Sequence, residues 1–347
     1  MSPLHYASVN RKYAYACPRD LAPLTIDSAS LTCPTCSSLY RIDNGIALLD
    51  VIANAQAAAF DAQHAGHEAL SAQARCSSVT LAGRFLDVAS AGAGVLDGKD
   101  ILEVGCGAGA LTYGLANTPR VRRSAIYAFD HSQSSLATLR ASLGNLANEN
   151  EIFLSAQDVH ALAFRDESFD VIMGCGVLHH FSALVDVVGS LRRMLRPGGI
   201  AIFTEPFASG YVILTSILVQ AARRLGTSLT GPGFGLAQFI VDDVSFRVQH
   251  ARDDDLLAPL IDKHLFTSAY VAELATLHGL KWRTVGVERP AFYQVFMRSF
   301  LNEYGIEDPS FREVALELYD DLQRHTGQAY GELFPHYQDI VFERPAD

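Results

Sequence analysis

Strand-like and helical segments alternate along the chain from residue 100 onward, and this alternation limits the fold more than any other feature. Apolar runs typical of buried strands occupy 100–105, 124–130, 151–156, 169–175 and 199–205. Helical patterns lie between them, and the last one ends with arginines followed by Pro-Gly-Gly, as helices commonly end. This alternation predicts a parallel sheet that is covered by helices on both faces.

The alternation is interrupted after residue 205 and resumes later. We expect an insertion at 206–265, in which a helix at 211–225 is so apolar that it must be buried against its own domain or a partner. A turn at the sequence GPGFG and an acidic, solvated loop should complete this insertion. The expected elements beyond it are a helix at 267–279, a strand at 280–288, a second insertion at 289–335 with a helix near 309–325, and a last, antiparallel strand at 339–345.

The glycine-rich sequence EVGCGAGA stands where the first strand passes into the first helix. Glycine allows positive φ and a close approach of the backbone to a ligand, and the helix start offers unpaired N–H groups. Such a turn suits a phosphate or a carboxylate. A dinucleotide fingerprint also fits Gly105, Gly107 and Ala110, and a tight turn without a ligand is a third interpretation.

Composition narrows the class of protein. The chain has 347 residues, 49% of them hydrophobic, which is enough apolar mass for a sizeable core. Its 27 Lys and Arg against 38 Asp and Glu give a net charge of −11, so nucleic acid is a poor default partner. Neither a signal peptide nor a segment of the roughly 20 apolar residues needed for a membrane span stands out. We therefore expect a soluble, cytoplasmic protein without a disulfide scaffold.

Four motifs in series resemble those of the class I S-adenosylmethionine-dependent methyltransferases. They are LEVGCGAG, AIYAFDHS, AQDVHALAFRDESFDVIMGCGVLHHF and LRRMLRPGGIAIFTEP, and the similarity covers about 100–206 and, more loosely, 267–288 and 337–345. The resemblance implies an α/β fold with a seven-stranded, mostly parallel Rossmann-like sheet. It also implies S-adenosylmethionine as the cofactor and predicts three segments: 1–50, 51–98 as a helical linker or lid, and 99–347 as the methyltransferase domain.

The resemblance also implies a role for individual residues. Asp130 would accept hydrogen bonds from both ribose hydroxyls, Asp158 would bind the adenine amino group, and Val159 would lie against the ring. Glu103 would hold the methionine end of the cofactor, directly or through the loop backbone. Cys175 should be a small buried residue rather than a reactive thiol. The rest of the expected cofactor set is Gly105, Cys106, Gly107, Gly109 and His131.

His179 and His180 follow the fourth strand, near the expected position of the transferred methyl group. One of them could act as a base on a hydroxyl or an acidic carbon; alternatively, they shape the pocket or cap the next helix. Acidic clusters at 242–243 and 253–255 could hold Mg²⁺ or simply be solvated. Aromatic residues that could face a small apolar substrate, or form ordinary core or a dimer contact, are Phe207, Tyr211, Phe234, Phe239, Phe292, Tyr293 and Phe296.

The N-terminal segment resembles the small zinc ribbon that precedes some methyltransferases, including certain rRNA guanine methyltransferases. Cys33 and Cys36 form a C-x-x-C knuckle, and Cys17 begins the other knuckle. Asp20 stands where that pattern has a cysteine. Because zinc also accepts carboxylate oxygen, a structural Cys₃Asp zinc site is one interpretation, and a ribbon that keeps its fold without metal is the other.

These observations favour an enzyme that methylates oxygen, carbon or nitrogen of a small, largely apolar or aromatic metabolite, with a homodimer as a possible assembly. Two alternatives stay open: an rRNA base methyltransferase that uses the ribbon for docking, and a cofactor-binding protein without turnover. A nicotinamide-dependent dehydrogenase is disfavoured by the later motifs and the expected antiparallel last strand.

Overall fold

The computed structural model describes residues 13–27, 29–49, 72–90, 95–144, 149–226, 232–286, 297–298, 300–302, 305–326 and 336–346. For 72–73, 232–237 and 326 only the backbone is described. Much of the predicted lid at 51–98 and of the insertion at 289–335 lies outside these residues, as do Phe292, Tyr293, Phe296 and the side chain of Phe234.

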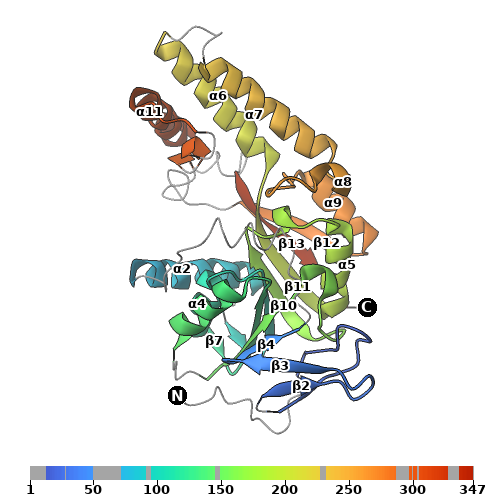
Figure 1. The fold of residues 1–347 in the computed structure, drawn as a ribbon. Helices are drawn as coiled ribbons and strands as arrows, with labels where there is room; N and C mark the ends of the chain where they lie inside the picture. Colours follow the sequence, from blue (N-terminus) through green and yellow to red (C-terminus); the bar gives the residue numbers. More distant parts are fainter. Residues whose placement is uncertain are drawn as a thin grey trace.

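A single large sheet forms the centre of the molecule (Figure 1). Seven of its strands lie in the order β9-β8-β6-β10-β11-β13-β12, and all are parallel except β13, which runs antiparallel to both neighbours. The predicted fold class and the antiparallel last strand are therefore confirmed. These strands are β6 (Asp100–Val104), β8 (Ala125–Asp130), β9 (Glu151–Ala156), β10 (Phe169–Cys175), β11 (Leu195–Pro206), β12 (Lys281–Gly286) and β13 (Tyr337–Glu343).

Within the described residues the sheet has eleven strands rather than the predicted seven, because the N-terminal segment extends it. Strand β4 pairs in parallel with β9, joining Ile46 to Leu154, and three further antiparallel strands follow outward from β4. The predicted ribbon thus continues the central sheet at one edge. The added strands are β1 (Thr25–Ile26), β2 (Ser30–Thr32), β3 (Leu39–Asp43) and β4 (Ile46–Leu48), and a separate two-stranded sheet consists of β5 (Leu96–Asp97) and β7 (Val121–Arg122).

Helices cover both faces of the sheet, as the apolar strands require. Leu102 and Val104 on β6 face one core, shared with α5 and α9, whereas Ile101 faces the other, shared with α2, α3 and α4. This alternation follows from the two-residue period of a strand. The helices are α2 (Ala72–Ala89), α3 (Ala110–Asn117), α4 (Gln133–Leu143), α5 (Leu184–Met194) and α9 (Ser268–Leu277), with 3-10 turns η1 (Val159–Ala161) and η2 (Leu178–His180).

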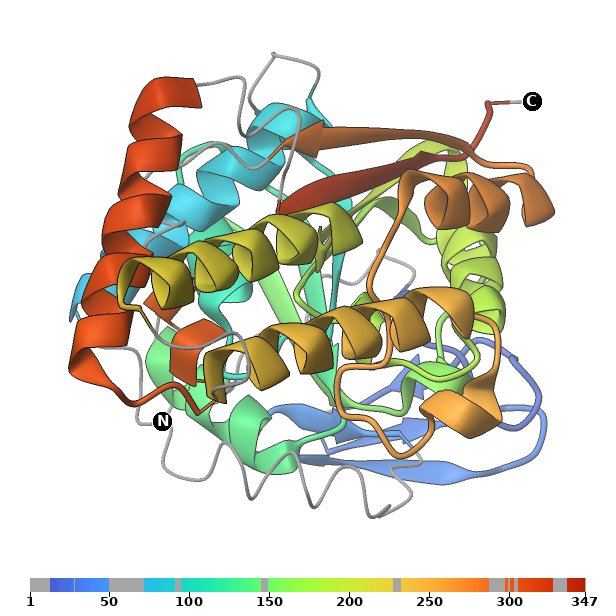
Figure 2. The same ribbon diagram turned by 90° about the horizontal axis from the view of Figure 1, so that it is seen from above.

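The insertions contribute α6 (Ala208–Arg224), α7 (Pro232–Gln249), α8 (Asp254–Leu257) and α11 (Pro309–Thr326). Helices α6, α7 and α11 gather beside the sheet (Figures 1 and 2) and share a third apolar core. The apolar helix α6 is therefore buried against its own chain.

Two expectations for the first insertion are wrong. The sequence GPGFG does not form a turn, since Pro232 begins α7, a position that suits proline because the first helical N–H has no intrahelical partner. The expected acidic loop at 242–243 is also helical. There Asp242 accepts a hydrogen bond from Gln238, and Asp243 pairs with Arg247 one turn later.

Candidate active site

The glycine turn lies at the carboxyl end of β6, the edge at which open α/β sheets bind ligands. The backbone is left-handed at Gly105, Gly107 and Gly109, with φ of 62°, 50° and 89°, and α3 begins directly after it. A Cβ on Gly105 would lie 2.2 Å from Val177 Cγ2, whereas one on Gly107 would meet nothing within 4 Å. Gly105 is therefore required by packing, and Gly107 presents bare backbone to open space.

Asp130 connects this turn to the next strand. Its Oδ2 accepts a hydrogen bond of 2.8 Å from the Gly107 N–H, and its Oδ1 accepts one of 2.9 Å from the Ser132 N–H. The side chain is almost fully buried at the end of β8. Asp130, which is predicted to bind the ribose, therefore contacts the predicted glycine turn directly.

Glu103 is buried one strand residue before the turn. It accepts a hydrogen bond from the Thr112 hydroxyl on α3. Burial raises the pKa of Glu103 to about 8, and the nearby Asp130 charge adds to this effect. In the structure described, the carboxyl group therefore joins β6 to α3 and is protonated near neutral pH.

The other predicted cofactor residues lie along the same edge. Asp158 caps the start of η1, where its side chain accepts a hydrogen bond of 2.9 Å from the His160 N–H, and Val159 next to it is buried. His131 follows Asp130 and is partly exposed, and Cys106 is buried. The expectation that Cys175 is buried is wrong: it is exposed, because it ends β10 where the strand passes into the Gly176 turn.

His179 and His180 lie on η2, directly beyond the carboxyl end of β10. The Nδ1 atom of His179 lies 2.7 Å from Oε2 of Glu205, near the end of β11, and both side chains are buried. The ring of His180 lies beside it, with 4.0 Å between the ring centroids. Val177, which precedes η2, packs on Gly105, so the histidine pair adjoins the glycine turn.

Asp262 joins the same group from the first insertion. Its Oδ1 lies 3.1 Å from Nδ1 of His180 and 3.7 Å from Nε2 of His179. Burial opposes ionisation of Asp262, but the hydrogen bond from His180 and nearby positive charges outweigh it and lower its pKa to about 2. Burial likewise opposes protonation of His180, yet its contacts with Asp262 and the Ile261 carbonyl raise its pKa.

Glu205 and Asp262 were not predicted from the sequence. Glu205 carried a usable signal, because an acidic residue at the end of a buried strand needs a partner at the carboxyl edge. Asp262 carried none, since only the folded insertion brings it beside η2.

Some of the aromatic residues that could face a substrate lie in the ordinary hydrophobic core. Phe207 is buried in the main core beside Phe266, and Tyr211 is buried in the third core beside Phe300. Phe239 on α7 is 60% exposed. Among the described members of this set, Phe239 alone presents most of its ring to solvent.

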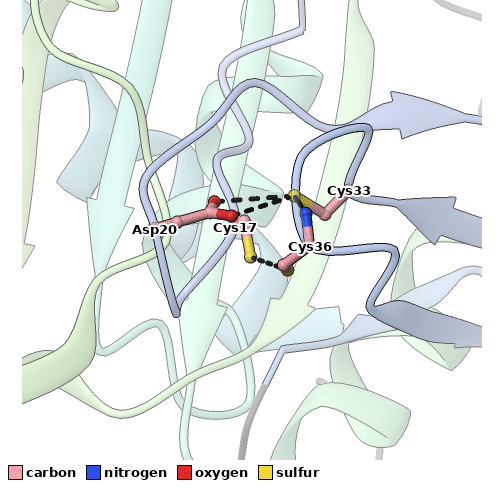
Figure 3. A group of neighbouring side chains, drawn as sticks. All are labelled: Cys17, Asp20, Cys33 and Cys36. Atoms are coloured by element: carbon pink, nitrogen blue, oxygen red, sulfur yellow. Dashed lines mark hydrogen bonds between the residues drawn. The ribbon is translucent and has the colours of Figure 1, made fainter.

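The four predicted zinc ligands converge from two turns of the ribbon (Figure 3). Their ligand atoms all lie within 4.8 Å of one another. Sγ of Cys17 lies 3.6 Å from Sγ of Cys36, and Sγ of Cys33 lies 3.4 Å from Oδ2 of Asp20. A tetrahedral site with Zn–S distances of about 2.3 Å separates its ligand atoms by about 3.7 Å, so the cluster has the dimensions of a zinc site.

The ionisation of the cluster also suits a metal. A hydrogen bond from the Ala22 N–H lowers the pKa of Asp20, with smaller contributions from the three thiols. A hydrogen bond from Ser38 lowers the pKa of Cys36, whereas burial raises the pKa of Cys33. Hydrogen bonds thus shift two of the four ligands, Asp20 and Cys36, toward the charged form that binds metal.

Comparison with known proteins places the similarity in the centre of the chain. Residues 102–203 match the family described as "Methyltransferase domain". The ubiquinone biosynthesis O-methyltransferase of Alkalilimnicola ehrlichii is 33% identical over 120 residues, which are 34% of this chain and 46% of that protein. The enzyme of the same name from Azoarcus sp. is 30% identical over 109 residues, 31% of this chain and 45% of that protein. The chain thus spans less than half the length of these relatives.

Among solved structures, phosphoethanolamine N-methyltransferase 2 of Haemonchus contortus, in complex with S-adenosyl-L-methionine, is 13% identical. The match covers 77% of this chain and 53% of that one, with a TM-score of 0.46. Within the part of the chain that the structure describes, no helix has the length and apolar character needed to cross a membrane. The family match spans nearly all of the four motifs, in their predicted order, and places a methyltransferase domain at residues 102–203.

Proposed function

We propose that this protein transfers the methyl group of S-adenosylmethionine to a small molecule. The observation that carries the proposal is the contact between the bare Gly107 backbone and the Asp130 carboxylate, beside the histidine pair on η2. The turn would receive the amino-acid end of the cofactor, and Asp130 would bind the ribose hydroxyls. Asp158 and Val159 would contact the adenine, with Cys106, His131 and Cys175 completing the pocket.

Glu103 would act on the methionine end through the turn rather than by direct contact. Its hydroxyl partner Thr112 lies on α3, whose N-terminus follows Gly109. A cationic ammonium group nearby would favour the charged form of Glu103. Cofactor binding and ionisation of Glu103 would then support each other.

The acceptor is proposed to be oxygen on a small aromatic or apolar molecule. The relatives from Alkalilimnicola ehrlichii and Azoarcus sp. are named as O-methyltransferases, and an oxygen acceptor has a proton to lose. His179 or His180 would accept that proton, a role that typically contributes about 10²–10⁴-fold to the rate. A cytoplasmic location and a homodimer are further parts of the proposal.

The Cys₃Asp cluster is proposed to hold one structural zinc ion. The spacing of Cys17, Asp20, Cys33 and Cys36 supports a tetrahedral site. Four protein ligands leave no open coordination position, so this metal would stabilise the ribbon and take no part in methyl transfer.

Transfer of radioactive methyl groups tests the proposal. Purified protein is incubated with labelled S-adenosylmethionine and either a panel of phenols and catechols or total RNA, with Asp130→Asn as the control. We expect label in the small-molecule fraction and at least tenfold less with the variant. Label confined to RNA would identify the ribbon as a docking module, and bound cofactor without any transfer would identify a protein that lacks turnover.

A further inference from the structure

Glu205 is held by four N–H contacts at the start of η2. Its Oε1 accepts hydrogen bonds from the Val177 and Leu178 N–H groups at 3.0 and 2.8 Å. Its Oε2 lies 3.3 Å from the His179 backbone nitrogen and 2.7 Å from Nδ1 of His179. Since the carboxylate serves as an acceptor in each contact, Nδ1 of His179 carries a hydrogen, and in the neutral ring Nε2 therefore carries the lone pair.

The lone pair on Nε2 faces a second carboxylate. Oδ1 of Asp262 lies 3.7 Å away, which is too far for a hydrogen bond but close enough for strong attraction to a positive ring. Two backbone hydrogen bonds fix this arrangement, because the Lys263 and His264 N–H groups donate to the His179 carbonyl at 2.7 and 3.1 Å. His180 holds Asp262 from its other side, through Nδ1.

The two histidines are therefore not equivalent. His179 has one ring nitrogen fixed by a buried carboxylate and the other directed to the side where Asp262 lies. The Nδ1 atom of His180 is occupied by the Ile261 carbonyl, at 3.1 Å, and by Asp262. Of the two, His179 has the arrangement of a base whose second nitrogen is oriented by a carboxylate.

We propose that His179 is the catalytic base for a hydroxyl acceptor, that Glu205 positions it by keeping the proton on Nδ1, and that Asp262 stabilises the imidazolium formed when Nε2 is protonated. This inference rests on the proposed function and deepens it. The acceptor O–H bond breaks as its proton passes to Nε2, and an oxygen electron pair forms the new O–CH₃ bond. The S–CH₃ bond breaks with its electron pair remaining on sulfur, which leaves S-adenosylhomocysteine.

The charge balance around His179 favours this role. Glu205 reaches it from β11, His180 lies on the same turn, and Asp262, Lys263 and His264 come from the loop before α9. Two charges on neighbouring helices also act on this loop: Arg247 on α7 interacts electrostatically with Asp262, and Asp254 on α8 with His264. The groups that face the two ring nitrogens themselves are both carboxylates. A tertiary amine or thioether acceptor has no proton to lose and would not use them.

Imidazole NMR of the free, ¹⁵N-histidine-labelled protein tests the assignment without a known acceptor. We expect His179 in the Nδ1–H form at pH 8. Asp262→Asn should shift the Nε2 signal of His179, because it removes a negative charge that lies 3.7 Å from this atom. Asp255→Asn on α8 is the matched control and should leave it unchanged. Glu205→Gln should weaken the preference for the Nδ1–H form. If the Glu205→Gln variant does not fold, Asp262→Asn still tests the proposal, because the side chain of Asp262 is 42% exposed.

An Nε2–H form of His179, or an Nε2 signal of His179 that Asp262→Asn does not move, would overturn the proposal. Joint shifts of the His179 and His180 signals on addition of micromolar Zn²⁺ would also overturn it, since the cluster would then be a cation site. Cofactor binding is measured separately, so a protein that binds no S-adenosylmethionine contradicts the proposed function, whereas a wrong tautomer contradicts the assignment of the base.

Discussion

Glu103 shows how one residue combines a structural and a functional role. Its carboxyl group is buried, hydrogen-bonded to Thr112, and has a pKa of about 8. As the pH rises from 5 to 8, the unfolded chain has already released this proton while the folded chain retains it. The folded state therefore binds more protons, and stability falls with rising pH over this window.

Replacement of Glu103 by Gln tests this directly. Gln keeps the size and an acceptor for the Thr112 hydroxyl but cannot ionise. The difference in free energy of unfolding between Glu103→Gln and the parent should grow in favour of the variant, by on the order of 3 kcal/mol between pH 5 and 8. Urea denaturation at several pH values measures it. If the unfolding free energies of the variant and the parent change with pH in parallel across this range, the raised pKa of Glu103 is contradicted.

At the residue scale, the sequence predicted the glycine turn and Asp130 because their chemistry depends on local order along the chain. The partners of His179 could not be predicted in the same way. Glu205 lies 26 residues away from His179 on the next strand, and Asp262 lies in an insertion. Which side chains reach the ring depends on how these elements pack.

Gly210 illustrates constraint at the scale of an element. It lies in the first turn of α6, where a Cβ would come within 2.2 Å of Nδ1 and 2.4 Å of Cα of His336. Close approach of α6 to the start of β13 therefore depends on this glycine. Residues that are distant in the sequence impose a requirement that helix propensity does not reveal.

Gly210→Ala should destabilise the protein by about 1–3 kcal/mol, because the backbone of residue 336 cannot rotate away from the added methyl group. Gly83→Ala in α2 is the matched control, since its Cβ would meet only Arg120 NH1, at 3.7 Å. Alanine there should stabilise the protein by up to about 1 kcal/mol through helix propensity. Chemical denaturation of both variants measures the contrast, and two effects of equal sign would contradict the packing described.

The elements themselves were largely predictable. The seven strands predicted from residue 100 onward lie within a few residues of their expected positions, because buried strands have strong apolar patterns. The main failure, the turn expected at GPGFG, arose because glycine and proline signal turns locally while Pro232 begins a helix packed against α6. Pairing of β4 with β9 was not predictable from a three-residue strand.

At the scale of the whole molecule, the ribbon and the central sheet share one hydrophobic core. Tyr15 is fully buried and stacks on Phe164, with its ring edge against Tyr127 of β8. Cys17 and Cys33 are part of this same core. Disruption of the Cys₃Asp cluster should therefore destabilise the central sheet as well as the ribbon.

Elemental analysis should find about one zinc ion per chain. Cys36→Ser should lose it, and Cys76→Ser, which alters an exposed cysteine on α2, should keep it. Removal of the metal by a chelator should lower the temperature of one common unfolding transition by about 5 °C or more. A separate low-temperature transition would show that the ribbon unfolds alone, and absence of zinc from the parent protein would contradict the site.

The central claim is that the Gly107 backbone and Asp130 together bind S-adenosylmethionine. Titration calorimetry of the purified protein with this cofactor tests it most directly. We expect one site per chain, at least tenfold weaker binding for Asp130→Ala, and no heat with NADH or NADPH. Binding of a nicotinamide nucleotide with no heat from S-adenosylmethionine would contradict the account.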